Sequence, residues 1–395
     1  MKVLHISNKP IYPILDGGCV AISHFLTCLL SAGYDVKHLT ISTDKHPFNI
    51  DEYPSTLCSI IRPESSFVNT AINPFSALAY IFKKGSYNID RFNNKRFRSL
   101  IKKYLKEQQV DFVVFESIYL ANYFSTIRKY SNAKIIIRSH NVEYLIWERL
   151  ANSQSSFLKK LYFKKLSSDL KKVELKTLQK IDGIACISDN DALIFKASGV
   201  KTLIETIPVS ILNQIKTADY SVNTFFHFGA MNWMPNLESV RWLVNSIFPK
   251  IREKDLNAKL ILAGNFMPEE FKTDASKGIE VIGSIGLKDD FFTSNGIMLT
   301  PLISGSGVRI KILEAMSFGV PIVTSEIGIE GINAQNNRDI LIAKNEDEFV
   351  SYAIDLSKSI KMREYIGTNA KNTIENNYQT DPIAKKIIEF FNKIS

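Results

Sequence analysis

SGSGVRIKILEAMSFGVPIVTS, residues 304–325, carries more structural information than any other stretch of this chain. Its Gly-Ser-Gly turn at 305–307 allows a tight bend and a close approach of the backbone to a ligand. Residues 309–318 have the pattern of a helix, and Gly319 suits a left-handed cap at its end. The apolar run at 320–324 is typical of a strand buried on both faces. The stretch therefore predicts a loop, a helix and a strand of an α/β sheet.

Two cations and a carboxylate lie next to this turn. Arg309 and Lys311 open the predicted helix, where free N–H groups and the positive end of the helix dipole attract a diphosphate. Arg309 suits a bidentate clamp on phosphate and Lys311 supplies a point charge. On an ideal helix the two side chains point about 200° apart, so one of them can reach a ligand that the other does not. Glu314 can accept hydrogen bonds from sugar hydroxyls. An ordinary βαβ unit with surface cations explains the same spacing without a ligand.

Length and composition describe a soluble globular protein of more than one domain. The chain has 395 residues, of which 45% are apolar and 23% are charged, and a chain of this length favours two cores. It has no apolar run long enough for a transmembrane helix. Its first residues have the pattern of a strand instead of a signal peptide. The four cysteines are scattered, so they predict neither a zinc site nor a disulfide framework and favour a reducing cytoplasm.

Short apolar runs alternate with amphipathic stretches along the chain, which is the pattern of an α/β protein. The alternation pauses over 209–223 and then restarts. We therefore predict two Rossmann-like βαβ domains, residues 1–210 and 211–380, facing each other across a cleft, with a final helix at 381–395. In such sheets ligands bind at the carboxyl ends of the strands.

Three segments lead to more specific expectations about local structure. Gly17-Gly18 is predicted to form a loop before a helix that starts at Val20. Residues 44–80 contain four prolines and are predicted to be irregular. Residues 142–180 are predicted to form one long helix.

Positive charge is concentrated in the first half. Residues 1–212 carry 29 Lys and Arg against 18 Asp and Glu, whereas the remainder carries 20 against 22. Much of the excess lies in two runs, 83–106 and 159–180. An anionic partner is one explanation, and a solvated lysine-rich helix face is the other. The runs lack the regular aromatic interleaving of a single-strand nucleic-acid groove, so we expect no nucleic-acid partner. Their mixture of cations with Phe, Tyr and Leu favours peripheral contact with an anionic membrane.

The segment from Gly305 to Met316, together with GVPIVT at 319–324, resembles the donor site of glycosyltransferase family 4, whose members have the GT-B fold. Four other segments resemble the family in order and spacing: Gly17-Gly18, SHNVE at 139–143, FGAMNWMPN at 228–236 and VIG at 281–283. The resemblance spans nearly the whole chain and is strongest over 225–331.

The resemblance implies transfer of a sugar from a nucleotide-sugar donor, a UDP- or GDP-sugar, to a hydroxyl of a glycan or lipid-linked acceptor in cell-surface polysaccharide synthesis. The anomeric configuration would be retained, and no metal or other cofactor would be needed, because protein cations and helix N-termini neutralise the leaving diphosphate. The second domain would bind the donor and the first the acceptor. The final helix would cross back to the first domain. The enzyme would be cytoplasmic and peripheral at the inner face of the membrane.

The resemblance also implies a set of site residues. His140, Arg309 and Lys311 would take part in catalysis. The donor-binding set would be Gly17, Gly18, Gly229, Asn232, Ile282, Gly283, Ser306, Gly307, Val308 and Glu314.

The chain departs from the family pattern at two places. Ser306 stands where many members have a glutamate, eight positions before Glu314. The loop at 229–236 has no cation, although many members have an arginine and a lysine there, so Arg309 and Lys311 would bind the diphosphate alone or with Asn232. These departures leave room for a non-catalytic partner subunit. An epimerase or a phosphorylase of the same fold is a further alternative.

Several single residues have more than one explanation. His140 has three explanations: it is an ordinary loop histidine, it contacts the donor sugar or its phosphate, or it acts as a general base. Glu143 is a site residue, or it caps the following helix together with Asn141. Trp233 and Asn236 are expected to form a rigid loop and a helix cap.

Overall fold

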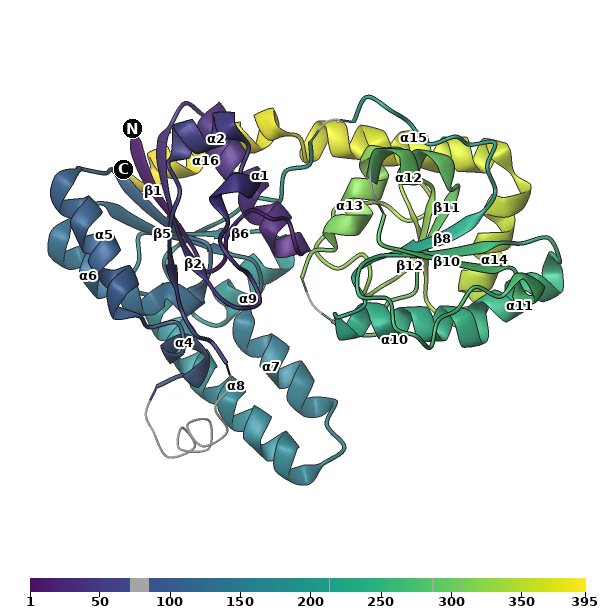
Figure 1. Ribbon diagram of the computed structural model, residues 1–395, viewed down its shortest axis with the longest axis horizontal. Coiled ribbons are helices and arrows are strands. Elements are labelled where there is room, and N and C mark those ends of the chain that lie inside the picture. Colours follow the sequence, from purple (N-terminus) through teal and green to yellow (C-terminus); the bar gives the residue numbers. More distant parts are fainter. Residues whose placement is uncertain (72–84, 213, 286–287, 306) are drawn as a thin grey trace. The chain divides into compact units, whose positions relative to one another are not determined.

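The computed structural model describes residues 1–71, 85–212, 214–285, 288–305 and 307–395. The chain divides into two compact units, and each is built on its own parallel sheet (Figure 1). Unit 1 comprises Met1–Ser210 and Ile383–Ser395, and unit 2 comprises Ile211–Pro382.

The described part of unit 1 forms a seven-stranded sheet in the order β3-β2-β1-β4-β5-β6-β7. All neighbouring pairs are parallel. Because the strands are parallel, their carboxyl ends lie at one edge of the sheet. The strands are β1 (Lys2–Ser7), β2 (Asp35–Ser42), β3 (Glu64–Phe67), β4 (Phe112–Phe115), β5 (Lys134–Ser139), β6 (Gly183–Cys186) and β7 (Leu203–Thr206).

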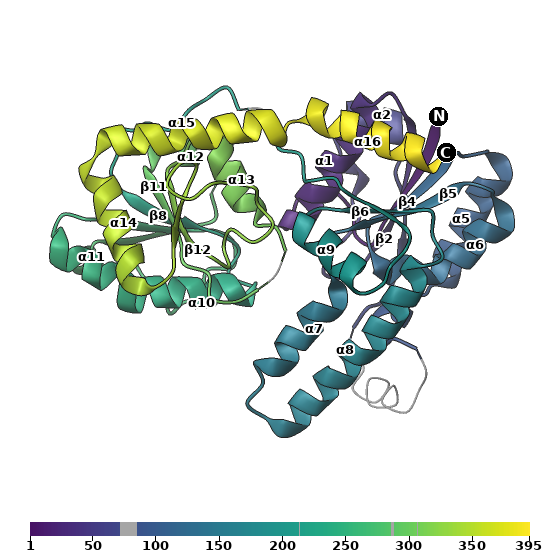
Figure 2. The ribbon, with the colours of Figure 1, turned by 180° about the vertical axis from the view of Figure 1, so that it is seen from behind.

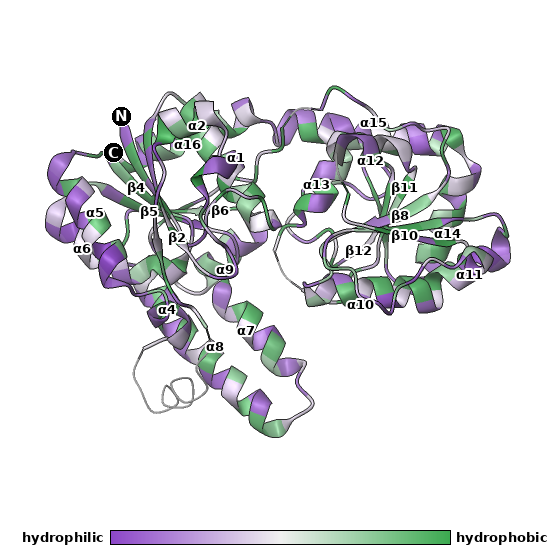
Figure 3. Ribbon diagram, viewed as in Figure 1, coloured by the Kyte–Doolittle hydropathy of each residue, from purple (hydrophilic) through white to green (hydrophobic). Residues whose placement is uncertain are grey.

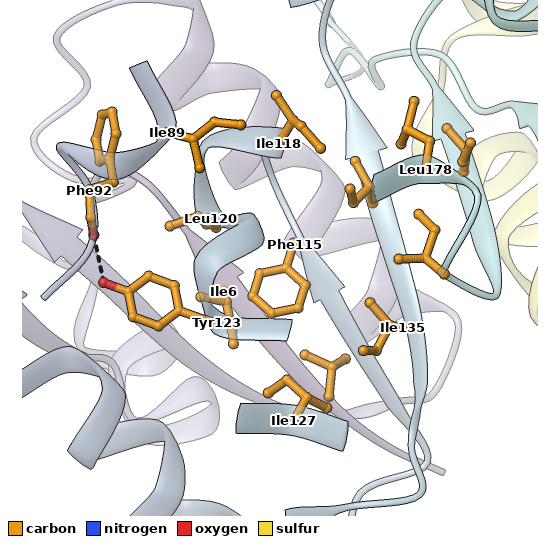
Figure 4. Packing of buried hydrophobic residues seen from close by; sticks show 14 of the residues in the cluster. Ile6, Ile89, Phe92, Phe115, Ile118, Leu120, Tyr123, Ile127, Ile135 and Leu178 are labelled. Atoms are coloured by element: carbon orange, nitrogen blue, oxygen red, sulfur yellow. Dashed lines mark hydrogen bonds between the residues drawn. The ribbon is translucent and has the colours of Figure 1, made fainter. Parts of the chain in front are cut away.

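Both faces of this sheet are buried, because successive side chains of a strand point to opposite faces. Leu4 and Phe115 belong to one apolar cluster, whereas Val3 and Val114 belong to the other. Figure 4 shows part of the first cluster, in which the Tyr123 hydroxyl donates a hydrogen bond of 2.6 Å to a backbone carbonyl. The inner strand β4, FVVF, is therefore apolar throughout, as a doubly covered parallel sheet favours.

The helices of unit 1 cover the two faces of the sheet. The last helix contributes five apolar side chains to the second cluster. A Cβ on Gly183 of β6 would lie 2.3 Å from Ile394, so this glycine makes room for that helix. The helices are α1 (Gly17–Ser31), η1 (Ile50–Glu52), α2 (Ser55–Ile61), α4 (Tyr87–Asp90), α5 (Lys95–Glu107), η2 (Ile118–Tyr123), α6 (Phe124–Tyr130), α7 (Glu143–Asn152), α8 (Phe157–Leu178), α9 (Asp189–Ala197) and α16 (Thr380–Ile394).

Three expectations about unit 1 are wrong. Residues 142–180 form a helical hairpin, α7 and α8, instead of one helix, because the polar stretch 153–156 breaks the pattern. The described part of 44–80 contains η1, α2 and the edge strand β3. Gly17 and Gly18 are the first residues of α1 and not a preceding loop, because the Asp16 side chain accepts a hydrogen bond from Cys19 N and caps the helix there.

The described part of unit 2 forms a six-stranded sheet in the order β10-β9-β8-β11-β12-β13, and again all pairs are parallel. The strands are β8 (Phe225–Phe228), β9 (Leu260–Ala263), β10 (Ile279–Gly283), β11 (Ile297–Thr300), β12 (Ile322–Ser325) and β13 (Leu341–Ala343). The helices are α10 (Met234–Trp242), η3 (Leu243–Ile247), α11 (Phe248–Lys254), η4 (Ala275–Lys277), α12 (Lys288–Ser294), α13 (Ile310–Ser317), α14 (Glu346–Lys358) and α15 (Ile360–Asn377).

The loop, helix and strand predicted over 304–325 are present as α13 and β12 with the turn before them. Gly319 has φ +72° directly after the helix, which confirms the left-handed cap. The helix begins one residue later than predicted, so Arg309 precedes it. No helix among the described residues has both the length and the apolar character needed to cross a bilayer.

Candidate functional site

Three glycine-containing loops of unit 2 are joined to one another at the carboxyl ends of β8, β9 and β10. The Gly229 amide donates to the Ala263 carbonyl at 3.1 Å, and the Gly264 amide donates to the Gly283 carbonyl at 2.7 Å. A Cβ on Gly264 would lie 1.8 Å from the Gly229 carbonyl oxygen. The predicted residues Gly229 and Gly283 therefore lie on adjacent loops, and Gly264 is needed for that close approach.

The Lys311 side chain reaches from α13 to the loop after β8. Its Nζ donates to Asn236 Oδ1 at 2.7 Å and lies 3.4 Å from His227 Nε2. His227 Nδ1 lies 2.8 Å from the Leu299 carbonyl and donates to it, so Nε2 carries the lone pair that faces the ammonium. The Asn236 amide in turn donates to the Ala230 carbonyl at 2.9 Å. Lys311 thus supplies a cation beside the loop at 229–236, which has none of its own.

The charge on Lys311 has little compensation. Burial lowers its pKa to about 7, and the nearby Arg309 guanidinium adds to the effect. Within the described residues no carboxylate is recorded as its partner, and its two recorded hydrogen bonds use two of three N–H groups. A buried cation in this situation is stabilised when an anion binds next to it.

Arg309 lies immediately before α13 and is only 4% exposed. Its Nη1 donates to the Gly307 carbonyl, and its guanidinium lies over the Trp233 ring at 5.3 Å from the centroid. A Cβ on Gly305 would lie 3.1 Å from Pro235 and from Arg309 Nη2. Gly305 thus packs closely against the guanidinium, and Arg309 is in direct contact with Gly307.

The other predicted residues of unit 2 lie in more varied surroundings. Glu314 is in α13 and is half-buried, as is Val308 in the turn. Asn232 is exposed, and Ile282 at the end of β10 is 45% exposed. Ser306 lies outside the described residues. The cap residue of α10 is Trp233, which makes no side-chain hydrogen bond to the helix. The expectation that Asn236 caps this helix is therefore wrong, and its side-chain oxygen accepts from Lys311 instead.

In unit 1, an unexpected cation lies beside the predicted glycine pair. Lys9 Nζ donates to both Asp16 oxygens at 2.9 Å. A Cβ on Gly18 would lie 2.4 Å from that Nζ, so Gly18 allows the ammonium to contact the first turn of α1. Gly17 and Gly18 therefore open a helix whose N-terminus has an adjacent cation.

Asp16, Cys19 and His46 have potential metal-ligand atoms within 4.8 Å of one another. However, Lys9 already neutralises the carboxylate, and His46 Nε2 donates to Asp16 Oδ2 at 2.9 Å. Burial alone would raise the pKa of Asp16, but His46 and Lys9 outweigh it and hold this pKa well below its usual range. The arrangement is that of an ion pair capping a helix, and it does not fit a metal.

His140 follows β5 and is held by a buried carboxylate. Its Nε2 lies 2.7 Å from Glu116 Oε2 and 3.3 Å from Arg138 Nη1. Arg138 Nη1 also donates to Glu116 at 3.3 Å, and its guanidinium stacks on Phe25 at 4.5 Å. Glu116 and Arg138 are fully buried, whereas the His140 side chain is 18% exposed. The carboxylate therefore fixes the orientation of a partly accessible imidazole.

The other oxygen of the Glu116 carboxylate is hydrogen-bonded to a pair of buried histidines. Its Oε1 accepts from His5 Nε2 at 2.7 Å, and His5 Nδ1 lies 2.9 Å from His38 Nδ1. A neutral His5 that donates from Nε2 must accept at Nδ1, so His38 donates from Nδ1. These four residues, His38, His5, Glu116 and His140, lie on or directly after the adjacent strands β2, β1, β4 and β5.

The protonation state of His140 follows from this environment. Burial lowers its pKa, and this outweighs the opposing effect of the hydrogen bond to Glu116. Burial would raise the pKa of Glu116, but Arg138, His140 and His5 together hold it well below the usual range. At neutral pH a charged Glu116 thus accepts from a neutral His140, whose Nδ1 lone pair has no recorded partner among the described residues. His140 can accept a hydrogen bond from a hydroxyl there.

Glu143 does not cap α7, and neither does Asn141. The first helix amides, those of Glu143 and Tyr144, donate to the Glu174 carboxylate of α8 at 3.2 and 3.1 Å. Glu143 instead accepts from the Tyr119 hydroxyl at 2.6 Å. Burial raises the pKa of Glu143 to about 7 and that of Glu174 to about 8.

Sequence reasoning missed five polar residues that shape these two regions: Lys9, Glu116, Arg138, His227 and Asn236. A weak signal existed for each of the three that lie on or directly after a strand, because a polar side chain in an apolar run is unusual in a buried sheet. No local pattern pointed to their partners, which are distant in sequence.

Comparison with known proteins finds a family match for part of the chain. Residues 222–359 match the family described as Glycosyl transferases group 1. This segment is similar to the group 1 glycosyltransferases. This confirms the predicted enzyme class, which transfers sugar from a nucleotide-sugar donor, and the matched segment lies in unit 2.

Two curated relatives are similar to this chain. An uncharacterized 44.6 kDa protein in the cps region of Klebsiella pneumoniae is 24% identical and covers 98% of this chain and 99% of its own length. An uncharacterized glycosyltransferase of Methanocaldococcus jannaschii is 28% identical over 39% of this chain and 41% of its own.

Solved structures confirm the predicted GT-B fold of this chain. HepE from Anabaena, in complex with UDP, superposes with a TM-score of 0.69 at 10% identity and full coverage of both chains. Sucrose-phosphate synthase from Thermosynechococcus elongatus gives 0.71 at 11% identity, with coverage of 100% of this chain and 99% of the other. TarM gives 0.69 at 12% identity, with coverage of 99% of both.

Proposed function

We propose that this enzyme transfers a sugar, with retention of configuration, from a UDP-sugar to a hydroxyl of a glycan or lipid-linked acceptor in cell-surface polysaccharide synthesis. The observation that carries the proposal is the half-buried Lys311 ammonium, which has no carboxylate partner among the described residues. It lies at the start of α13 beside Arg309, where the free N–H groups of the helix also favour an anion.

These groups match the charge that develops during sugar transfer. The bond to the leaving phosphate oxygen breaks as the sugar becomes oxocarbenium-like, so negative charge increases on the diphosphate. Arg309 and Lys311 would stabilise this charge without a metal. Glu314 would accept hydrogen bonds from the ribose hydroxyls. The loops of Gly229, Gly283 and Gly307 would let the donor approach the backbone closely.

Similar proteins support uridine as the nucleobase of the donor and a surface polysaccharide as the product. HepE has been solved with UDP and with UDP-glucose, and TarM with UDP, which favours uridine over guanosine. The Klebsiella relative belongs to a cps region, which supports synthesis of a surface polysaccharide. The predicted place of action is the cytoplasmic face of the membrane, where the basic unit 1 would contact anionic lipid.

His140 would act from unit 1 as a hydrogen-bond acceptor. Its Nε2–H is engaged by Glu116 at 2.7 Å, so a neutral ring offers only the Nδ1 lone pair. A hydroxyl of the donor sugar or of the acceptor matches this group better than a phosphate oxygen, which needs a donor.

The pKa of Lys311 leads to a test of the diphosphate contact. A bound diphosphate favours the charged ammonium and raises a pKa that lies near 7 in the free protein. Binding above pH 7 should therefore take up a proton, and affinity for UDP-glucose should fall about tenfold per pH unit above that value. UDP-glucose suits the test because its diphosphate has no proton to lose near neutral pH.

Calorimetric titration in two buffers of different ionisation enthalpy measures this proton uptake. Lys311→Met should remove both the uptake and the pH slope, whereas Lys344→Met, at an exposed position of unit 2, should keep both. A pH slope that survives in Lys311→Met would show that Lys311 does not contact the diphosphate.

The donor itself is identified by thermal shift with UDP- and GDP-sugars, followed by mass spectrometry of the products with candidate acceptors. Binding of a UDP-sugar raises the melting temperature, since ligand binds only the native state. Glu314→Ala should weaken that shift. The proposal fails if no nucleotide sugar supports transfer and Glu314→Ala leaves binding unchanged. Conversion of the donor without an acceptor would instead identify an epimerase.

A further inference from the structure

The α7–α8 hairpin of unit 1 extends away from the sheet that carries it (Figures 1 and 2). Its base is firmly attached, because Glu174 of α8 accepts the first amides of α7 and Ser167 donates to the Tyr144 carbonyl at 2.9 Å. Further along, the rings of Trp147 and Phe163 face each other across the two helices at 6.0 Å. The hairpin is thus a packed element with an ordered inner side.

The far end of the hairpin exposes large apolar side chains. Phe157 is 74% exposed, Leu158 is 78% exposed and Leu161 is 52% exposed. Leu161 lies four positions after Phe157 and three after Leu158, so the three share one helix face. Leu150 at the end of α7 adds a fourth apolar side chain at 38% exposure. We call residues 150–164 the hairpin tip.

The tip combines this apolar face with positive charge. Residues 157–168 contain four lysines and no aspartate or glutamate. Figure 3 shows apolar residues near the turn between the two helices, with polar residues among them. Apolar side chains that can enter the acyl boundary, with lysines that meet lipid phosphates, are the two requirements of a surface-bound helix.

The part of the other basic run, 83–106, that lies in α5 has a different structure. In α5 the apolar residues Phe97, Ile101 and Leu105 are all buried in the core of unit 1. Its lysines, such as Lys103, lie on the opposite, exposed face. The charge of α5 is therefore an ordinary solvated face, whereas the tip exposes cations together with apolar side chains.

We propose that the hairpin tip is the membrane-contact surface of this enzyme and inserts shallowly into an anionic bilayer. This deepens the proposed function, on which it rests for the lipid-linked acceptor, by assigning the contact to one element. A second copy of the chain is a poorer occupant, because two tips rich in lysine and without acidic residues over 157–168 would repel each other.

Cosedimentation with vesicles tests the assignment. The wild-type enzyme should bind vesicles of phosphatidylcholine with phosphatidylglycerol and not vesicles of phosphatidylcholine alone, and salt should weaken binding. Lys159→Gln with Lys164→Gln should reduce binding about tenfold or more. The matched pair Lys95→Gln with Lys103→Gln removes the same charge from α5 and should change it little. Equal effects of the two pairs would overturn the proposal.

A second pair of variants tests insertion. Phe157→Ser with Leu158→Ser should also reduce vesicle binding at least tenfold. Leu256→Ser removes an apolar side chain of 75% exposure from unit 2 and should leave binding unchanged. Sedimentation velocity without lipid tests whether a second copy of the chain binds the tip instead. If the wild type self-associates and the serine pair dissociates it, the tip is a protein interface and the proposal is wrong.

Failure of this proposal can be distinguished from failure of the proposed function. Vesicle binding needs no donor, and sugar transfer to a soluble acceptor needs no vesicle. Tip variants should keep transfer to a soluble acceptor at the wild-type rate while they lose vesicle binding.

Discussion

Replacing Lys311 by methionine is expected to lower kcat/KM for sugar transfer by about 10²–10³-fold, the usual effect of losing one group that stabilises developing negative charge. Lys311 Nζ is the half-buried cation at the start of α13, and methionine fills a similar volume without a charge. Initial rates of UDP release at saturating acceptor measure the change. Most of the loss should appear in kcat if the ammonium acts mainly on the leaving diphosphate of the transition state.

Stability provides the control for this variant. An isolated buried ammonium destabilises the fold, so Lys311→Met should melt at the same temperature as the wild type or higher. Lys344→Met, at an exposed site of unit 2, should change neither activity nor melting. Full activity in Lys311→Met would exclude Lys311 from the donor site, and a strongly reduced melting temperature would mean that its role is structural.

Replacing Glu116 by glutamine is expected to lower the free energy of unfolding by about 3–5 kcal/mol, because it leaves a buried arginine without its counter-charge. Glu116 is fully buried and accepts from Arg138, His140 and His5. Glutamine has one acceptor oxygen and no charge, so it cannot serve all three. Urea unfolding of the two proteins at pH 7 measures the difference.

Glu143→Gln is the matched comparison, since Glu143 is also a carboxylate held within unit 1. Burial raises its pKa to about 7, so the fold favours its neutral form and glutamine should cost little or nothing. In addition, Arg138→Met in the Glu116→Gln background should recover part of the lost stability, because it removes the uncompensated charge. Equal destabilisation by Glu116→Gln and Glu143→Gln would contradict the assigned charge on Glu116.

Much of the fold could be predicted because parallel strands buried on both faces are continuous apolar runs. Runs such as 112–115 and 297–300 have little alternative to a strand when helical stretches flank them. The edge strand β3, Glu64–Phe67, was missed because an edge position needs no apolar run, and its sequence ESSF has none.

The hairpin was predicted as one helix because the residues between α7 and α8 include no glycine or proline. The cluster of Asn152, Ser153, Gln154 and two serines was the signal for a break. The break was not recognised because the residues on either side, rich in leucine and lysine, favour a helix. Because a single helix has no turn at this point, the prediction did not reveal the hairpin tip.

The predicted residues of α13 could be located from local spacing, but their partners could not. Lys311 bonds Asn236, which is 75 positions away, and Glu116 bonds His5, which is 111 positions away. Such contacts depend on which strands become neighbours. His140 was identified by resemblance, whereas the carboxylate that orients it and the arginine beside that carboxylate emerged only from the sheet order β2-β1-β4-β5.

The shared Glu116 has an evolutionary consequence. One of its oxygens accepts from His140 at the accessible end and the other from His5 inside the sheet. A change at His140 therefore alters the electrostatics of the core, and a change in the core alters the histidine that we propose contacts substrate. We expect homologues to keep or exchange His5, His38, Glu116, Arg138 and His140 as a set, so that this part of the enzyme diversifies by replacing a whole network and not by single steps.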